Sequence, residues 1–222
     1  MPGRSWRRWS EVPNNLSFAC QDGMGLPDYI THYFEADRGP FRNICDLNDE
    51  EAGKLVREEE NAATGFNRFA MGGDFLTWRR EADDLLIRAY AEKFGYPPEG
   101  RPYFALLGSF DKTLTMFREG KKIEMEVSGF SENELTFMYP DHAHLVTVYG
   151  SDAPPLFYQP PVDWSRESFW GRLFTLAELR EVYSQLGIDK MIHAHMERDG
   201  WAGCYVEAHL WRRSLRSDEW GA

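Results

Sequence analysis

One long amphipathic segment constrains the fold of this chain more than any other feature. Apolar side chains recur at helical spacing from Phe75 to Phe94, which predicts a helix with a single apolar stripe. The stripe comprises Phe75, Trp78, Ala82, Leu85, Leu86, Ala89, Tyr90 and Phe94. Asp74 is the expected N-cap, and Gly95 before two prolines predicts the end of the helix.

The charged residues of this helix form two pairs at a spacing of four residues. Arg79 precedes Asp83 and Arg80 precedes Asp84, so the two members of each pair can meet on the helix surface. We interpret these pairs as a solvated face opposite the apolar stripe, and we expect no site there.

Most of the remaining chain has the pattern of a sheet. Runs of β-branched and aromatic residues, bounded by turn residues, predict strands. The expected strands cover 29–34, 103–107, 113–118, 122–127, 134–139, 144–149 and 204–211. Glu119-Gly120 predicts a hairpin between the strands at 113–118 and 122–127. The five expected strands between 103 and 149 suggest a meander.

Two shorter helices are expected at about 48–60 and 175–186, each with a capping box at its start. Asn48 with Glu51 begins the first, and Thr175 with Glu178 begins the second. Strands and helices together predict an α+β fold, a mixed or mainly antiparallel sheet of about 6–7 strands with two or three packed helices. We expect residues 1–26 to form an irregular arm and residues 27–222 a single domain.

Composition and charge exclude several classes of partner. The net charge of -11 argues against general nucleic-acid binding, because phosphate neutralisation needs a surplus of Lys and Arg. No stretch approaches the roughly 18 apolar residues of a membrane span. The three cysteines are far apart and form no CxxC pair, which indicates a reducing, cytoplasmic location for a soluble protein.

No familiar catalytic signature is present. The chain lacks a Walker loop, a dinucleotide glycine fingerprint, an HExxH motif and a G-x-S-x-G elbow. The sequence therefore leaves open whether the protein is an enzyme.

Two copies of a His-x-His pattern are candidates for metal binding, because alternate residues of a strand share a face. His142 and His144 enter an expected strand, and two neutral imidazoles suit Zn, Fe, Ni or Cu. The second pair, His193 and His195, lies in a segment with helical spacing at 188–199, where the two rings would diverge. The first pair is therefore the better candidate.

The expected last strand offers a second set of polar residues. Glu207 and His209 share a face with Tyr205 and Trp211. This face is either a cleft wall, with a carboxylate as base or ligand between two rings, or the outer face of an edge strand. The Pro-rich loop at 151–164, which carries Tyr158 and Trp164, is a candidate lid over such a cleft.

The order of three residues carries a family resemblance. His32 and Tyr33 lie on an early expected strand, and Glu207 lies on a late one. This order is similar to the His…Tyr…Glu order of some ADP-ribosyl-transfer enzymes, and the similarity covers these three residues only. It implies an NAD-consuming transferase in which His32 holds the nicotinamide ribose and Glu207 polarises its hydroxyl.

Three functions therefore compete. The first is the binding of a small ligand in an aromatic-lined, acidic cleft near the last strand and the loop at 151–164. The second is a metal-dependent hydrolase or oxygenase that holds a divalent transition metal with His142, His144, Glu207 and His209. The third is the NAD-consuming transferase.

Overall fold

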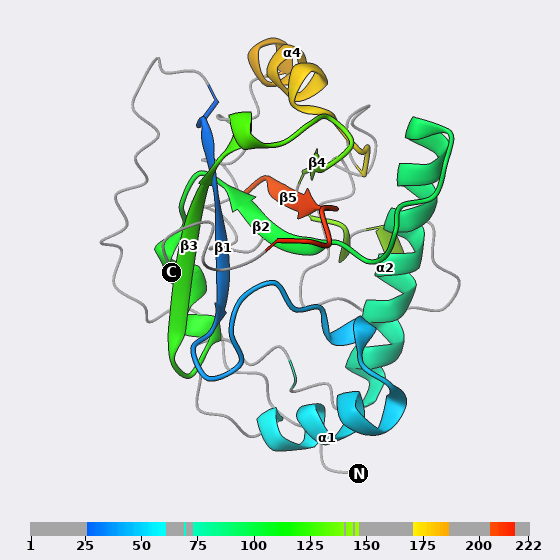
Figure 1. Cartoon of the computed structure of the whole chain (residues 1–222), viewed down its shortest axis with the longest axis vertical. Helices are drawn as coiled ribbons and strands as arrows, with labels where there is room; N and C mark the ends of the chain where they lie inside the picture. The colour runs from blue at the N-terminus through cyan, green and yellow to red at the C-terminus, as the bar shows by residue number, and fades with distance from the viewer. Residues whose placement is uncertain are drawn as a thin grey trace.

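A computed structural model of the chain describes residues 26–60, 69, 73–139, 141–143, 145–146, 171–186 and 205–215. Within these ranges five strands form one antiparallel sheet in the order β3-β1-β2-β5-β4 (Figure 1). The strands are β1 (Tyr29–Glu35), β2 (Tyr103–Leu107), β3 (Gly120–Glu126), β4 (Leu135–Met138) and β5 (Glu207–Leu210). The predicted α+β class is confirmed, with fewer described strands than the 6–7 expected.

Three α-helices accompany the sheet in the described part of the chain. They are α1 (Asp49–Glu59), α2 (Gly73–Phe94) and α4 (Leu176–Leu186). The predicted capping box of α1 is present, because Asn48 accepts from the Glu51 N–H and Glu51 accepts from the Asn48 N–H. Gly95 ends α2 in the left-handed region at φ 79°, a conformation that favours glycine.

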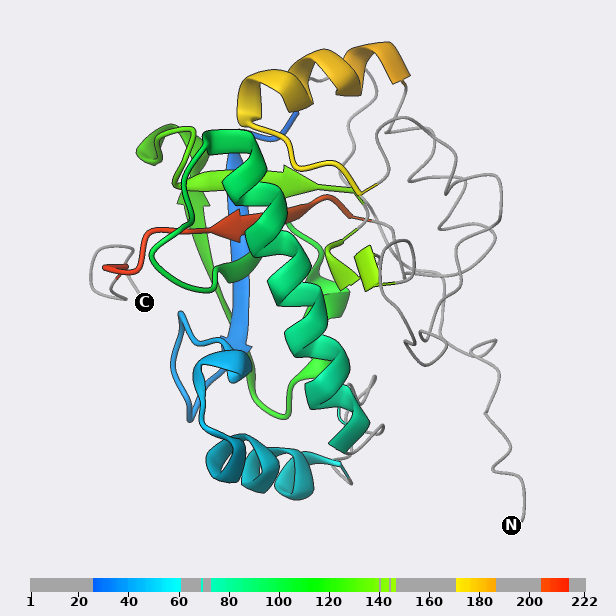
Figure 2. The ribbon, with the colours of Figure 1, turned by 90° about the vertical axis from the view of Figure 1, so that its right-hand side faces the viewer.

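Helices cover both faces of the sheet at its β5–β4 side (Figures 1 and 2). On one face Leu179 of α4 packs in a core with Phe137 and Ala208. On the other face the apolar stripe of α2 packs against Met138 and Trp211. Both faces of β5 are therefore buried, and charged groups on that strand must find partners inside the protein.

Helix α1 and the far end of α2 form a second, smaller core. Val56 of α1 packs there with Phe75, Trp78 and Ala82 of α2. Figure 1 shows α1 at the lower end of the molecule, away from the β5–β4 side of the sheet.

The predicted hairpin around Glu119-Gly120 is wrong. Residues Asp111–Met116 form a 3-10 helix, so β3 has no sequence-adjacent partner on its N-terminal side. β3 pairs instead with β1 over seven residues, from Tyr29 opposite Glu126 to Glu35 opposite Gly120. This long-range ladder satisfies the backbone groups that a local hairpin would have used.

The predicted strand at 144–149 is wrong in its described part, and with it the meander. Ala143, Leu145 and Val146 are helical, and the Leu145 N–H donates to the His142 carbonyl at 3.0 Å. Leu145 and Val146 are buried against α2 in two different clusters, and this packing outweighs the β propensity of the segment.

Several expectations concern residues outside the described ranges. They are the arm at 1–25, His144, the loop at 151–164 with Tyr158 and Trp164, and the segment 188–199 with His193 and His195. Among the described residues, no helix combines the length and apolar character needed to cross a membrane.

Candidate metal centre

Three of the predicted metal-binding residues converge in the interior. His142, Glu207 and His209 are buried, and one ligand atom from each lies within 4.8 Å of the other two. Glu207 Oε2 accepts hydrogen bonds from His142 Nδ1 at 2.7 Å and from His209 Nε2 at 3.0 Å. The group is a carboxylate between two imidazoles, a donor set that suits a divalent transition metal.

β5 positions two of the three groups. Glu207 and His209 are separated by one residue, so both side chains point to the face of the sheet that α2 covers. Each has a strand neighbour on both sides, Leu106 and Met138 for Glu207, and Phe104 and Thr136 for His209. Because β5 lies between β2 and β4, neighbouring strands position both groups from two sides.

His142 enters the centre from the segment that follows β4. Its backbone N–H donates to Glu207 Oε2 at 2.8 Å, in addition to the bond from its ring. The ring stacks on Phe104, with centroids 4.4 Å apart and an interplanar angle of 21°. The carboxylate of Glu207 thus holds both the backbone and the side chain of His142.

A directed chain of hydrogen bonds holds His209 from its other side. Trp211 Nε1 donates to Thr136 Oγ1 at 2.8 Å, and Thr136 Oγ1 lies 3.2 Å from His209 Nδ1. Because the Trp211 indole can only donate, the Thr136 hydroxyl is free to donate to His209 Nδ1. His209 Nε2 then carries the hydrogen that is donated to Glu207, and the ring is neutral.

Asp83 of α2 adjoins the centre, which corrects the expectation of a solvated face. Its side chain is fully buried, and Oδ1 lies 3.2 Å from His142 Nε2 and 3.1 Å from Arg79 Nε. Asp83 Oδ2 accepts from Asn43 Nδ2 at 2.9 Å. The predicted pair of Arg79 with Asp83 is thus formed, but in the interior. The second predicted pair is not formed, since Arg80 bonds Asp49 and Asp84 bonds Arg101.

Burial and charge act in opposite directions on these groups. Burial favours the neutral form of Glu207, but the charge and hydrogen bond of His142, with the hydrogen bond of His209, lower the pKa of Glu207 well below its usual range. Burial also opposes the charging of His142, yet the negative charge of Glu207 raises the pKa of His142. Burial lowers the pKa of His209. These effects favour the ionised form of Glu207, the charged form of His142 and the neutral form of His209.

The two rings expected beside Glu207 and His209 contact other side chains of the protein. Trp211 is buried, and its ring packs on Tyr90 with centroids 4.4 Å apart. The Tyr205 hydroxyl donates to Asp141 at 2.9 Å. The observed partners of both rings are side chains of the protein itself.

His32 lies on the opposite face of the sheet from Glu207. Thr31 is paired with Leu106, and Leu106 with Glu207, so these three residues share one face and His32 has the other. The His32 ring is fixed between the Phe104 carbonyl at 2.7 Å and the Phe41 N–H at 2.9 Å. The structure does not bring His32 and Glu207 to one site.

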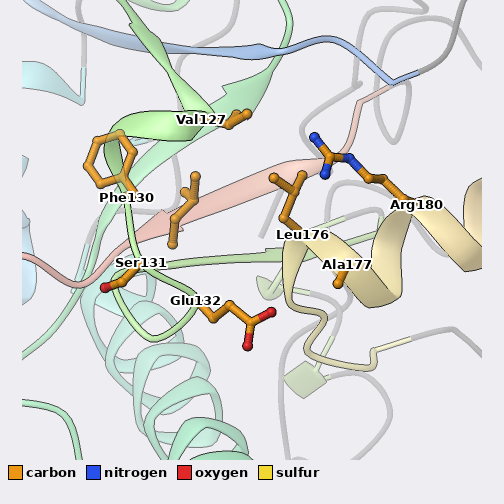
Figure 3. Close-up of a pocket in the computed structure, with 8 residues that line it drawn as sticks. Val127, Phe130, Ser131, Glu132, Leu176, Ala177 and Arg180 are labelled. Atoms are coloured by element: carbon orange, nitrogen blue, oxygen red, sulfur yellow. The ribbon is translucent and has the colours of Figure 1, made fainter.

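A small pocket lies away from the metal centre, between α4 and the turn that follows β3 (Figure 3). Its volume is about 140 Å³, and its lining includes Phe130, Leu176 and Arg180. Ligand sites usually enclose about 300–1,000 Å³. Of the predicted ligand-binding residues that the structure describes, neither Tyr205 nor Trp211 lines this pocket.

Sequence reasoning missed Asp83 and Thr136 as neighbours of the centre. For Asp83 a signal was present, because it precedes Leu86 by three residues and Tyr90 by seven, and both belong to the apolar stripe. An acidic residue at such a position shares the buried face and requires a partner there. Thr136 carried no comparable signal.

Comparisons of the chain with protein-family models, with curated proteins and with solved structures each find no match. The functional inference therefore depends on the chemistry of these buried side chains.

Proposed function

We propose that this domain binds a divalent transition metal ion through His142, Glu207 and His209. The observation that carries the proposal is the convergence of two imidazoles and one carboxylate within 4.8 Å. The ion would take the place of the hydrogen on His142 Nδ1, which would be released, and of the hydrogen on His209 Nε2, which would move to Nδ1 and be donated to Thr136 Oγ1. Metal and protons compete for the same atoms, since metal ligands must be deprotonated.

The donor set also supports a reactive centre. Three protein ligands leave at least one coordination position for water or substrate, which is the pattern of catalytic rather than structural zinc sites. Two histidines with one carboxylate also hold iron(II) in oxygenases. A metal-dependent hydrolase or oxygenase is therefore the activity class that we propose for this centre. His144 is not needed for this donor set.

Metal analysis of the purified protein tests the proposal. We expect Zn, Fe, Ni or Cu at about one ion per chain, removable by a chelator and restored by added metal. Glu207→Gln keeps the shape of the side chain and removes the anionic ligand, so this variant should lose the metal. Glu126→Gln, an exposed position on β3, is the matched control and should keep it.

The two outcomes separate the metal centre from an ionic cluster without a metal. If the wild type and Glu126→Gln bind the metal and Glu207→Gln does not, the result supports the proposed centre. A wild-type protein that takes up no metal after chelation and reloading would sink the proposal. The small ligand in an aromatic cleft and the NAD-consuming transferase stay predictions, and no contact in the described residues favours either over the metal.

A further inference from the structure

We propose that His142 binds the ion through Nδ1, and that Asp83 is the positioning residue that holds its ring in this orientation. This inference rests on the proposed metal centre. It specifies which nitrogen of His142 binds the ion and which residue selects that nitrogen. An imidazole offers two nitrogens to a metal, and the nitrogen that does not bind selects the orientation by its own hydrogen bond.

The two nitrogens of His142 face two different carboxylates. Nδ1 lies 2.7 Å from Glu207 Oε2, on the side shared with His209. Nε2 lies 3.2 Å from Asp83 Oδ1, on the side of α2. A ring turned by 180° would present carbon atoms to both carboxylates and lose both contacts. Only the observed orientation places a nitrogen at the centre.

Asp83 is itself held in place by groups from three segments. Arg79, one turn earlier on α2, lies 3.1 Å from Oδ1, and Asn43 donates to Oδ2 at 2.9 Å. Arg101, just before β2, lies 3.6 Å from Oδ2. Because these contacts restrict the Asp83 carboxylate, it has little freedom to move with the His142 ring. The carboxylate therefore sets the orientation of the ring.

The hydrogen-bond geometry between Asp83 and His142 can improve when the ion binds. His142 Nε2 and Asp83 Oδ1 are both buried, and neither has an aligned hydrogen-bond partner despite their short separation. When the ion replaces the hydrogen on Nδ1, the hydrogen on Nε2 remains and can donate to Asp83. A buried donor and acceptor left unaligned are costly, so a small ring rotation that aligns them is favourable.

The outward-facing nitrogen of His209 meets a hydroxyl group, whereas that of His142 meets the carboxylate of Asp83. The nitrogen of His209 that faces away from Glu207 meets the Thr136 hydroxyl at 3.2 Å, a neutral group that can donate or accept. A carboxylate partner raises the basicity of a metal-bound imidazole more than a hydroxyl does. His142 is therefore the stronger of the two imidazole ligands.

Titration of metal-free protein with Zn²⁺ in competition with a chromophoric chelator tests the role of Asp83. We expect Asp83→Asn to weaken Zn²⁺ binding about 10- to 100-fold, the usual cost of losing such a partner. Glu92→Gln, which makes the same kind of change at an exposed position of α2, is the matched control and should bind like the wild type. Equal affinity in Asp83→Asn and wild type would overturn the role of Asp83.

A second measurement on wild-type protein avoids the risk that Asp83→Asn fails to fold. Long-range ¹H–¹⁵N spectra of the histidine rings with Zn²⁺ bound should show His142 metal-bound at Nδ1 and protonated at Nε2. The reverse pattern would overturn the inference while leaving the metal centre intact. No Zn²⁺ binding by the wild type would overturn both.

Discussion

At Glu207 a single carboxylate oxygen accepts from two imidazole rings and one backbone N–H. Two of these donors come from residues singled out by the His-x-His pattern and by the alternation of β5. The third residue of the first pattern, His144, lies outside the described ranges, and the strand that was to align it with His142 is helical where it is described. Three of the four predicted ligands therefore lie together through contacts between residues far apart in sequence, and not through the local strand geometry that was expected.

Thr136 links Trp211 to His209, so its hydroxyl is expected to contribute to stability. In Thr136→Val the buried Trp211 Nε1 and His209 Nδ1 both lose their partner, at a cost of about 1–3 kcal/mol in the free energy of unfolding. Thr136→Ser keeps the hydroxyl and should cost clearly less. Urea unfolding of both variants measures the difference. A Thr136→Val protein as stable as the wild type, or no less stable than Thr136→Ser, would contradict this role of the hydroxyl.

His32 should make the protein less stable in acid. Burial lowers the pKa of His32 from 6.5 to about 4, so the ring stays neutral in the folded protein while the unfolded chain binds a proton below pH 6.5. Stability from this group is complete above pH 6.5 and is lost as the pH falls toward 4.

The His32 contribution is measured by comparing wild type with His32→Gln between pH 7 and pH 4.5. The wild type should lose about 2–3 kcal/mol more of its free energy of unfolding over this range. Parallel stability profiles for the two proteins would contradict the assignment, because other acidic groups contribute equally to both.

At the scale of elements, local signals predicted the helices correctly. The pairing of the strands was not predicted, because it depends on contacts between residues far apart in sequence. The capping residues Asn48 and Gly95 lie within one turn of the ends they define, so sequence alone locates α1 and α2. β3 pairs with β1, some ninety residues earlier in the chain, and no short-range pattern encodes that choice. The burial of Asp83 depends on the same kind of long-range contact, with Asn43 and His142.

The N-cap of α1 gives a prediction at this scale. Asn48→Ala removes the acceptor of the Glu51 N–H and should lower the free energy of unfolding by about 1 kcal/mol. Asn48→Asp keeps an acceptor and should be close to wild type. Chemical denaturation monitored by circular dichroism compares the two, and an Asn48→Ala protein as stable as wild type would contradict the cap.

Across the whole molecule, the proposed metal centre joins β5, the segment after β4 and, through Asp83, helix α2. An ion that binds only the folded protein should therefore raise its overall stability. At a free concentration 100-fold above the dissociation constant, the gain is about 2.7 kcal/mol, or roughly 5–10 °C in Tm. A thermal melt with and without chelator measures it, and a Tm independent of Zn²⁺ would contradict the linkage.

The ligand set itself is the central claim. X-ray absorption spectroscopy of the Zn²⁺-loaded protein tests it most directly, because imidazole and sulfur scatter differently. The buried Cys45 thiol should stay protonated, since burial and the charge of Asp83 raise its pKa to about 12. We predict two imidazoles and oxygen ligands at about 2.0–2.2 Å, with no sulfur. A sulfur shell near 2.3 Å, or fewer than two imidazoles, would contradict a centre built from His142, Glu207 and His209.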